Sequence, residues 1–211
     1  MEAATLKKIA VFASGRGSNF SAVLEQIKLG NIAAEVACVV SDHVQPPVFD
    51  IAVDHGIPTH WVNRKQFSAA EDYAGFLIGL LESYDVDLVL LAGYLKLIPS
   101  PLVKRYRYAM INIHPALLPN FGGKGFYGAK VHEAVIESGV KITGVTVHFV
   151  DECYDRGSVI LQETVEVLED DTAESLAHRV LQVEHRVFPQ VVKAFCEDKI
   201  HISNGKVIWE K

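Results

Sequence analysis

Two kinds of apolar segment alternate along the chain. Short runs rich in β-branched residues predict strands, and the early runs are almost continuously apolar, as in parallel strands that helices cover on both faces. These runs occupy residues 9–13, 36–40, 86–92, 110–114, 142–150 and 159–167. The last two alternate more between polar and apolar residues and flank the turn-like segment CYDRGS, so they predict an antiparallel hairpin at the edge of the sheet.

Between the strands, apolar residues recur at helical spacing. Helices are predicted around residues 20–27, 73–84, 129–138 and 171–195, and the first and third end at Gly30 and Gly139. In the last helix, Asp171 and Glu174 predict a capping box, and Pro189 predicts a kink. This order of elements predicts an α/β fold with a doubly wound, mostly parallel, Rossmann-like sheet. No linker or repeat interrupts it, so we expect a single domain over residues 1–211.

The charge and cysteine content narrow the classes of partner. The 211 residues include 20 Lys or Arg and 26 Asp or Glu, a net charge of −6, which argues against a protein that wraps nucleic acid. No apolar run is long enough to span a bilayer, and the start of the chain lacks a secretory signal. Cys38, Cys153 and Cys196 form no CxxC pair and are expected to be packing residues. We therefore expect a cytoplasmic protein without nucleic-acid or membrane partners, although a local site for a small anion fits this charge.

A glycine-rich segment, SGRGSN at residues 14–19, follows the first predicted strand and opens the first predicted helix. Backbone N–H groups and the helix dipole at such a place can hold a phosphate. The dinucleotide fingerprint needs a third glycine where this chain has Phe20, and no Walker A motif follows, so a monophosphate fits better than NAD. The alternative is a tight turn in which Ser18 or Asn19 caps the helix.

Asn112 and His114 lie near the end of the strand at 110–114, and strand alternation puts both side chains on one face. An amide beside an imidazole suits acyl transfer, because the amide can donate to a tetrahedral oxyanion while the imidazole moves protons. If Asp155 reaches His114 from the hairpin turn, its charge would raise the pKa of the imidazole. Since no GxSxG motif or nearby cysteine offers a nucleophile, we expect direct transfer to a bound amine. The alternative is a polar strand end and an ordinary turn at residues 154–157.

The other histidines are less informative. No spacing of His, Cys and carboxylate residues predicts a metal site. His148 alternates onto one face of its strand and is a candidate to line the site. The histidines expected at the surface or as capping groups are His132, His178, His185 and His201.

Five segments together carry a resemblance to a known family: VFASGRGSN, LVLLAGYLKLI, NIHPALLPNFGGKGFYG, GVTVHFVDECYDRGSVILQ and VEHRVFP. With them the chain resembles the phosphoribosylglycinamide formyltransferases, from about Lys8 to about Lys206. NIHPALLP is shared with other folate-dependent formyltransferases. The resemblance implies an enzyme of de novo purine biosynthesis that transfers a formyl group from 10-formyltetrahydrofolate to the amine of glycinamide ribonucleotide through a tetrahedral intermediate. Apart from the resemblance, we expect a monomer or homodimer, without NAD because of Phe20 and without a metal because no ligand spacing predicts one.

The same resemblance assigns roles to individual residues. Asn112 would polarise the formyl oxygen, His114 would transfer the proton, and Asp155 would tune the imidazole. The residues implied to hold the phosphate and ribose of the acceptor are Gly15, Arg16, Gly17, Ser18, Asn19 and Glu184. The residues implied to bind the folate are Leu95, Lys96, Leu97, Ile98, Val150, Asp151, Glu152 and Asp155.

The chain departs from the family pattern at a few positions. Some members carry an arginine that helps bind the folate where this chain has Ala70, and Arg64 or Lys65 is a candidate substitute. Lys96 stands where an arginine is common, and the two cations are not equivalent for carboxylate contacts. Arg156 stands where a small residue is frequent.

Three alternatives stay open. A 10-formyltetrahydrofolate hydrolase has the same fold but usually an added amino-terminal domain, and formate release without an amine would identify it. A transformylase acting on aminoacyl-tRNA would need a more basic RNA-binding region. A non-catalytic nucleotide-binding module, or an NAD-dependent protein, could also use this sheet.

Overall fold

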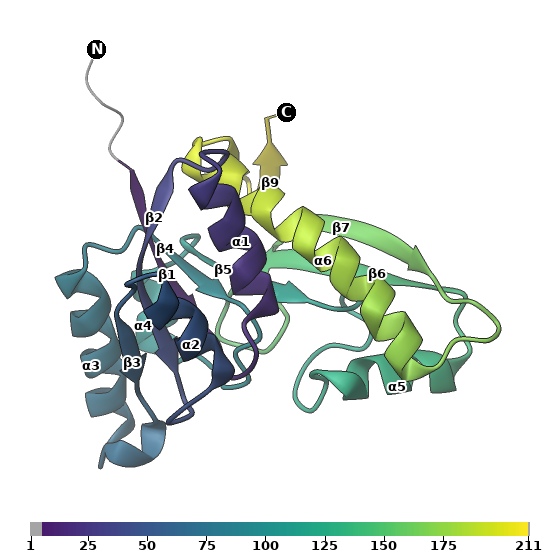
Figure 1. Cartoon of the computed structure of the whole chain (residues 1–211), viewed down its shortest axis with the longest axis horizontal. Helices are drawn as coiled ribbons and strands as arrows, with labels where there is room; N and C mark the ends of the chain where they lie inside the picture. Colours follow the sequence, from purple (N-terminus) through teal and green to yellow (C-terminus); the bar gives the residue numbers. More distant parts are fainter. Residues whose placement is uncertain (1–5, 211) are drawn as a thin grey trace.

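A computed structural model describes residues 6–210. A seven-stranded sheet lies at the centre of the molecule, with helices around it (Figure 1). Its strand order is β3-β2-β1-β4-β5-β6-β7. The first five strands in this order are parallel, and β6 and β7 form an antiparallel hairpin at one edge, as the sequence predicts. The strands are β1 (Lys7–Phe12), β2 (Ala34–Ser41), β3 (Thr59–Trp61), β4 (Leu88–Leu91), β5 (Met110–His114), β6 (Ile142–Phe149) and β7 (Val159–Glu166).

Helices connect the strands and cover the sheet. They are α1 (Ser18–Lys28), α2 (Pro47–Asp54), α3 (Ala70–Ser83), α4 (Ser100–Arg105), α5 (Ala129–Ser138), α6 (Ala173–Cys196) and the short 3₁₀ helix η1 (Arg64–Gln66). The predicted bounds of α5 are confirmed, and Gly139 ends it with a left-handed φ of 70°. The sequence reading missed α2, α4 and the three-residue strand β3. It also missed a separate antiparallel pair, β8 (Ile200–Ser203) and β9 (Lys206–Trp209). No described helix is long and apolar enough to cross a membrane.

The start of α6 differs from the predicted one. Thr172 is the N-cap, and its hydroxyl accepts from the Ser175 N–H at 3.1 Å while the Ser175 hydroxyl accepts from the Thr172 N–H at 3.0 Å. Asp171 instead accepts a hydrogen bond from Arg179 at 2.6 Å, so the predicted Asp171–Glu174 capping box is wrong. The helix continues through Pro189 to its end.

Each face of the sheet carries its own hydrophobic core. On one face α1, α2 and α6 contribute residues such as Phe20, Val48 and Phe188. On the other face α3 and α4 contribute Leu77 and Leu102. Successive residues of β1 and β4 belong alternately to the two cores, which explains why the early strands are apolar without interruption.

From β5 onward, loops and not helices pack against the face of the sheet that α3 and α4 cover elsewhere. Strand alternation places Asn112 and His114 on the same face as Met110, which packs in the α3–α4 core. Beyond Met110, residues 115–128 and 150–158 lie against this face in place of a helix. Polar side chains therefore end the strand beneath two irregular segments.

Candidate functional site

The glycine loop at residues 14–19 lies at the point where the strand order reverses between β1 and β4. The Ser14 N–H donates to the Gly93 carbonyl at 3.0 Å, which joins the carboxyl ends of these two strands. Gly17 caps α1 with a φ of 75°, and a Cβ atom there would lie 2.5 Å from Cγ2 of Val48. The position therefore requires glycine. Because Gly17 is the N-cap and α1 already begins at Ser18, the expectation that Ser18 or Asn19 caps the helix is wrong.

Asn19 and Glu184 meet where α1 packs on α6, so two of the residues assigned to the acceptor lie together. Both side chains are buried. Burial raises the pKa of Glu184 to about 7, and hydrogen bonding with Asn19 opposes part of that rise. Within residues 6–210, Oδ1 of Asn19 has no hydrogen-bond partner. Arg16, in the same loop, is exposed.

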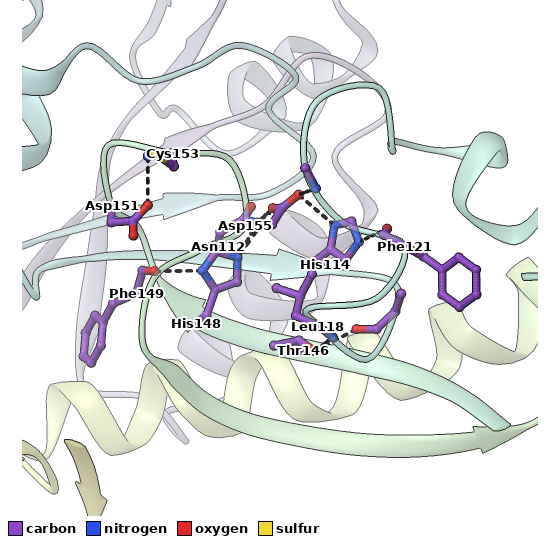
Figure 2. Close-up of polar contacts among 12 residues, drawn as sticks. Asn112, His114, Leu118, Phe121, Thr146, His148, Phe149, Asp151, Cys153 and Asp155 are labelled. Carbon is purple, nitrogen blue, oxygen red and sulfur yellow. Dashed lines mark hydrogen bonds and ion pairs between the residues drawn. The ribbon is translucent and has the colours of Figure 1, made fainter. Parts of the chain in front are cut away.

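The Asp155 carboxylate is the centre of a second polar cluster (Figure 2). Its Oδ2 accepts from the Gly123 N–H at 2.8 Å and lies 3.7 Å from Nδ1 of His114. Its Oδ1 lies 3.7 Å from Nε2 of His148 and 3.4 Å from Nδ2 of Asn112. The hairpin turn therefore brings Asp155 to the Asn112–His114 pair, a contact that the sequence analysis left open.

Backbone carbonyls fix the hydrogen positions on both histidines. His114 donates from Nε2 to the Phe121 carbonyl at 2.8 Å, so Nδ1 is the nitrogen that faces Asp155. His148 donates from Nδ1 to the Phe149 carbonyl at 2.7 Å. When neutral, its Nε2 accepts from Nδ2 of Asn112 at 3.0 Å, which orients the amide. His148 thus lies inside the cluster, as its strand position suggests.

The pKa values depend on burial as well as on charge. Burial lowers the pKa of His114, and the Asp155 charge and the Phe121 carbonyl offset only part of that effect. The Asp155 charge acts in the expected direction, but burial, which the sequence analysis did not consider, outweighs it in the pKa of His114. For Asp155, burial raises the pKa, but the polar contact with His148, the charge of His114 and the Gly123 N–H together bring it below its usual value.

Two cavities meet at Asn112 and Asp155. The larger, of about 300 Å³, is lined by His114, residues 123–128 and two residues assigned to the folate, Leu95 and Asp155. The smaller, of about 50 Å³, is lined on one side by Lys96, Leu97 and Ile98 and on the other by Val150, Asp151, Cys153 and Tyr154. Glu152 lines neither cavity and pairs with Lys104 at 3.5 Å, so the structure separates it from the other candidate folate residues.

Other candidate residues are placed differently from expectation. His132 is only 6% exposed and not at the surface, and Cys153 is exposed beside the smaller cavity and not a packing residue. A third cavity, of about 310 Å³, is lined by Ala70, Arg64 and Lys96, whereas Lys65 is absent from its lining. Within residues 6–210, no cluster of three or more His, Cys, Asp or Glu side chains could hold a metal ion.

An amide, an imidazole and a carboxylate at the junction of two cavities suit the transfer of a group between two bound small molecules. A family model described as formyl transferase matches residues 7–192 of the chain. The chain belongs to the formyl transferase family. This assignment agrees with the five sequence segments that carry the resemblance.

Relatives within the formyl transferase family match nearly the whole chain. The phosphoribosylglycinamide formyltransferase of Bacillus subtilis is 39% identical over 89% of this chain and 94% of its own. The chloroplastic phosphoribosylglycinamide formyltransferase of Vigna unguiculata is 44% identical over 97% of this chain, which spans 64% of that relative's length. The crystal structure of glycinamide ribonucleotide transformylase 1 from Symbiobacterium toebii is similar at a TM-score of 0.91, with 35% identity, over 98% of this chain and 95% of its own.

Proposed function

We propose that the chain transfers a formyl group from 10-formyltetrahydrofolate to the amine of glycinamide ribonucleotide, a step of de novo purine biosynthesis. The observation that carries the proposal is the Asn112, His114 and Asp155 cluster at the junction of two cavities in a member of the formyl transferase family. The relatives named above bear the name of this activity.

The acceptor is assigned to the larger cavity and the glycine loop. The amine lies near His114, and the phosphate lies at residues 15–19, where α1 offers backbone N–H groups. The two places are close because β1 and β5 are separated only by β4, or roughly 10 Å at two strand spacings. Glu184, buried beside Asn19, is assigned to the ribose hydroxyls.

The donor is assigned to the smaller cavity. At about 50 Å³ this space is well below the volume of an ordinary ligand pocket, roughly 300 Å³ or more, so a fused two-ring heterocycle enters only if its walls move apart. One wall, residues 150–154, belongs to an irregular turn between β6 and β7, whereas the opposite wall follows β4. We assign the movement to the turn.

Asn112 supplies the oxyanion donor. One of its N–H groups is held by Nε2 of His148 at 3.0 Å, and the other makes only a long 3.4 Å contact with Asp155. The formyl oxygen replaces this weaker contact. As the amine attacks the formyl carbon, negative charge develops on that oxygen and strengthens the new hydrogen bond.

His114 and Asp155 take up the proton that the attacking amine releases. While His114 is neutral, Nδ1 and the carboxylate Oδ2 present lone pairs to each other at 3.7 Å, and a proton between them is attracted by both. The resulting imidazolium donates to Phe121 on one side and faces Asp155 on the other. It then returns the proton to N10 of the folate, the leaving nitrogen.

Product analysis tests this proposal. We expect formylated glycinamide ribonucleotide and deformylated folate in equal amounts, and no formate when the acceptor is omitted. His114→Ala and Asn112→Ala should each lower the rate on the order of 10²–10³-fold. Amine-independent formate release would instead establish the hydrolase, which the names of the relatives do not favour.

Calorimetry with NAD, glycinamide ribonucleotide and a folate analogue tests the non-catalytic and NAD-dependent alternatives. We propose that NAD does not bind, since Phe20 fills the third glycine position of the fingerprint. We likewise propose that the protein binds neither nucleic acid nor membranes.

The assembly and location complete the proposal. We propose a single domain, present as a monomer or homodimer in the cytoplasm. One cooperative unfolding transition tests the single domain, and light scattering tests the monomer or homodimer. Cell fractionation tests the third against a plastid location like that in the name of the Vigna relative.

A further inference from the structure

Three polar residues lie in one row across the hairpin half of the sheet. His114 on β5 is directly opposite Thr146 on β6, and Thr146 is directly opposite Gln162 on β7. Residues paired in this way project from the same face. The edge strand therefore places Gln162 in line with the proposed catalytic imidazole, on the face covered by residues 115–128.

Thr146 and Gln162 bind the first part of that covering segment. Thr146 donates its hydroxyl to the Ala116 carbonyl at 2.7 Å and accepts from the Leu118 N–H at 3.0 Å. Gln162 donates from Nε2 to the Leu118 carbonyl at 2.9 Å and to the Thr146 hydroxyl at 3.0 Å. Figure 2 shows the Leu118–Thr146 contact beside His114.

This network engages the whole Thr146 hydroxyl and both N–H groups of the Gln162 amide. A threonine hydroxyl has one hydrogen and two lone pairs, and all three are engaged. The Gln162 amide has two hydrogens, and both are donated. Within residues 6–210, no other donor reaches the Leu118 carbonyl, so loss of the Gln162 amide leaves this backbone acceptor without a partner.

The second part of the same segment touches the proposed catalytic groups. The Phe121 carbonyl accepts from Nε2 of His114, and the Gly123 N–H donates to Asp155. Between these contacts and the anchor at Leu118 there are only a few residues. A shift at Leu118 therefore reaches both contacts through a short piece of chain.

We propose that Gln162 is a positioning residue that holds residues 116–123 so that Phe121 and Gly123 keep His114 and Asp155 in their reactive arrangement. It touches no substrate and acts through the loop. The inference deepens the proposed function and rests on it for its kinetic consequences. Its structural consequence, the state of the His114 ring, is independent of which reaction the protein catalyses.

Gln162→Met tests the inference, because methionine is unbranched and close in length but donates no hydrogen bond. Gln162 is exposed, so the substitution leaves no buried cavity. Thr164→Val is the matched control: Thr164 is exposed on the same face of β7, two residues along, and lies opposite Gly144 and not opposite a member of the row. Both variants are to be measured for melting temperature, kcat, the two KM values and the NMR titration of His114.

In Gln162→Met we expect kcat to fall roughly 10–100-fold, with both KM values within about twofold of wild type, because only the alignment of the reacting groups changes. We expect the His114 pKa to move down, since the Phe121 contact contributes to raising it. Thr164→Val should leave all five quantities unchanged.

Two results overturn the inference: a folded Gln162→Met protein with wild-type kcat and wild-type His114 titration, or a lower kcat matched by a lower melting temperature with the titration unchanged. If the wild-type chain transfers no formyl group, the proposed function fails. The His114 titration then decides the positioning role alone, since a downward shift in Gln162→Met supports it and an unchanged value rejects it.

Discussion

Replacing Asp155 by asparagine removes one negative charge from the centre of the polar cluster and changes its shape little. The amide oxygen can still accept from the Gly123 N–H, which now contacts Oδ2 at 2.8 Å. The substitution therefore tests charge more than loop structure. In the proposed reaction that charge matters when His114 carries the proton, because the imidazolium then faces the carboxylate.

The size of the effect follows from the distance between the two groups. The His114 and Asp155 side chains are 5% and 11% exposed and lie 3.7 Å apart, so their attraction is moderately screened. At an effective dielectric constant of about 20, unit charges at this separation attract by about 4 kcal/mol. Because about 1.4 kcal/mol corresponds to a factor of ten, we expect kcat of Asp155→Asn to fall on the order of 10³-fold.

The assay measures formylated product and deformylated folate at saturating concentrations of both substrates across a range of pH. Asp155 raises the pKa of His114, so its loss should also move the His114 titration to lower pH. Asp170→Asn is the control, since it removes the same charge from an exposed position outside both cavities. A folded Asp155→Asn enzyme with kcat within about threefold of wild type at every pH would refute the charge argument.

Two further predictions concern stability. Glu184 has a folded pKa of about 7 against 4.5 for the ordinary carboxyl, so the folded state holds its proton more tightly and loses about 3 kcal/mol as the pH rises from 4.5 to 7. Glu184→Gln should remove this loss, which urea unfolding of both proteins at pH 5 and pH 8 measures; an equal pH dependence in the two proteins would contradict it. Gly17→Ala should cost about 1–3 kcal/mol, because it adds a Cβ atom 2.5 Å from Val48 at a positive φ. Val48→Ala in the same chain should restore part of that stability in thermal unfolding, and no restoration would show that the close contact is not the cause.

Sequence patterns predicted the elements whose signals are local. Helix α5 ends where Gly139 follows an apolar stripe, and the bounds of β5 agree with the run that ends in His114. Helix α4 has six residues and β3 has three, so neither is long enough to show a period. The capping box was misplaced by one residue because Asp171 binds Arg179, a partner that a short motif does not include.

The candidate site was predicted in its composition but not in its electrostatics. Alternation on β5 correctly paired Asn112 with His114, and Asp155 reaches them. His114 is deeply buried because the loop after β5 folds back and places the Phe121 carbonyl against its ring. No local sequence pattern predicts that this loop folds back. The signal for Gln162 was present, since it alternates onto the polar face of the predicted hairpin, but its partner Leu118 lies 44 residues away.

The replacement of helices by loops over β5 to β7 has a consequence for engineering this protein. Both hydrophobic cores, with the helices that build them, draw little from the two segments that cover the proposed site. A screen for expression or for heat resistance would thus select almost entirely for intact packing of the two cores. Libraries directed at residues 115–128 and 150–158 need a turnover screen, because well-behaved inactive proteins should be abundant among them.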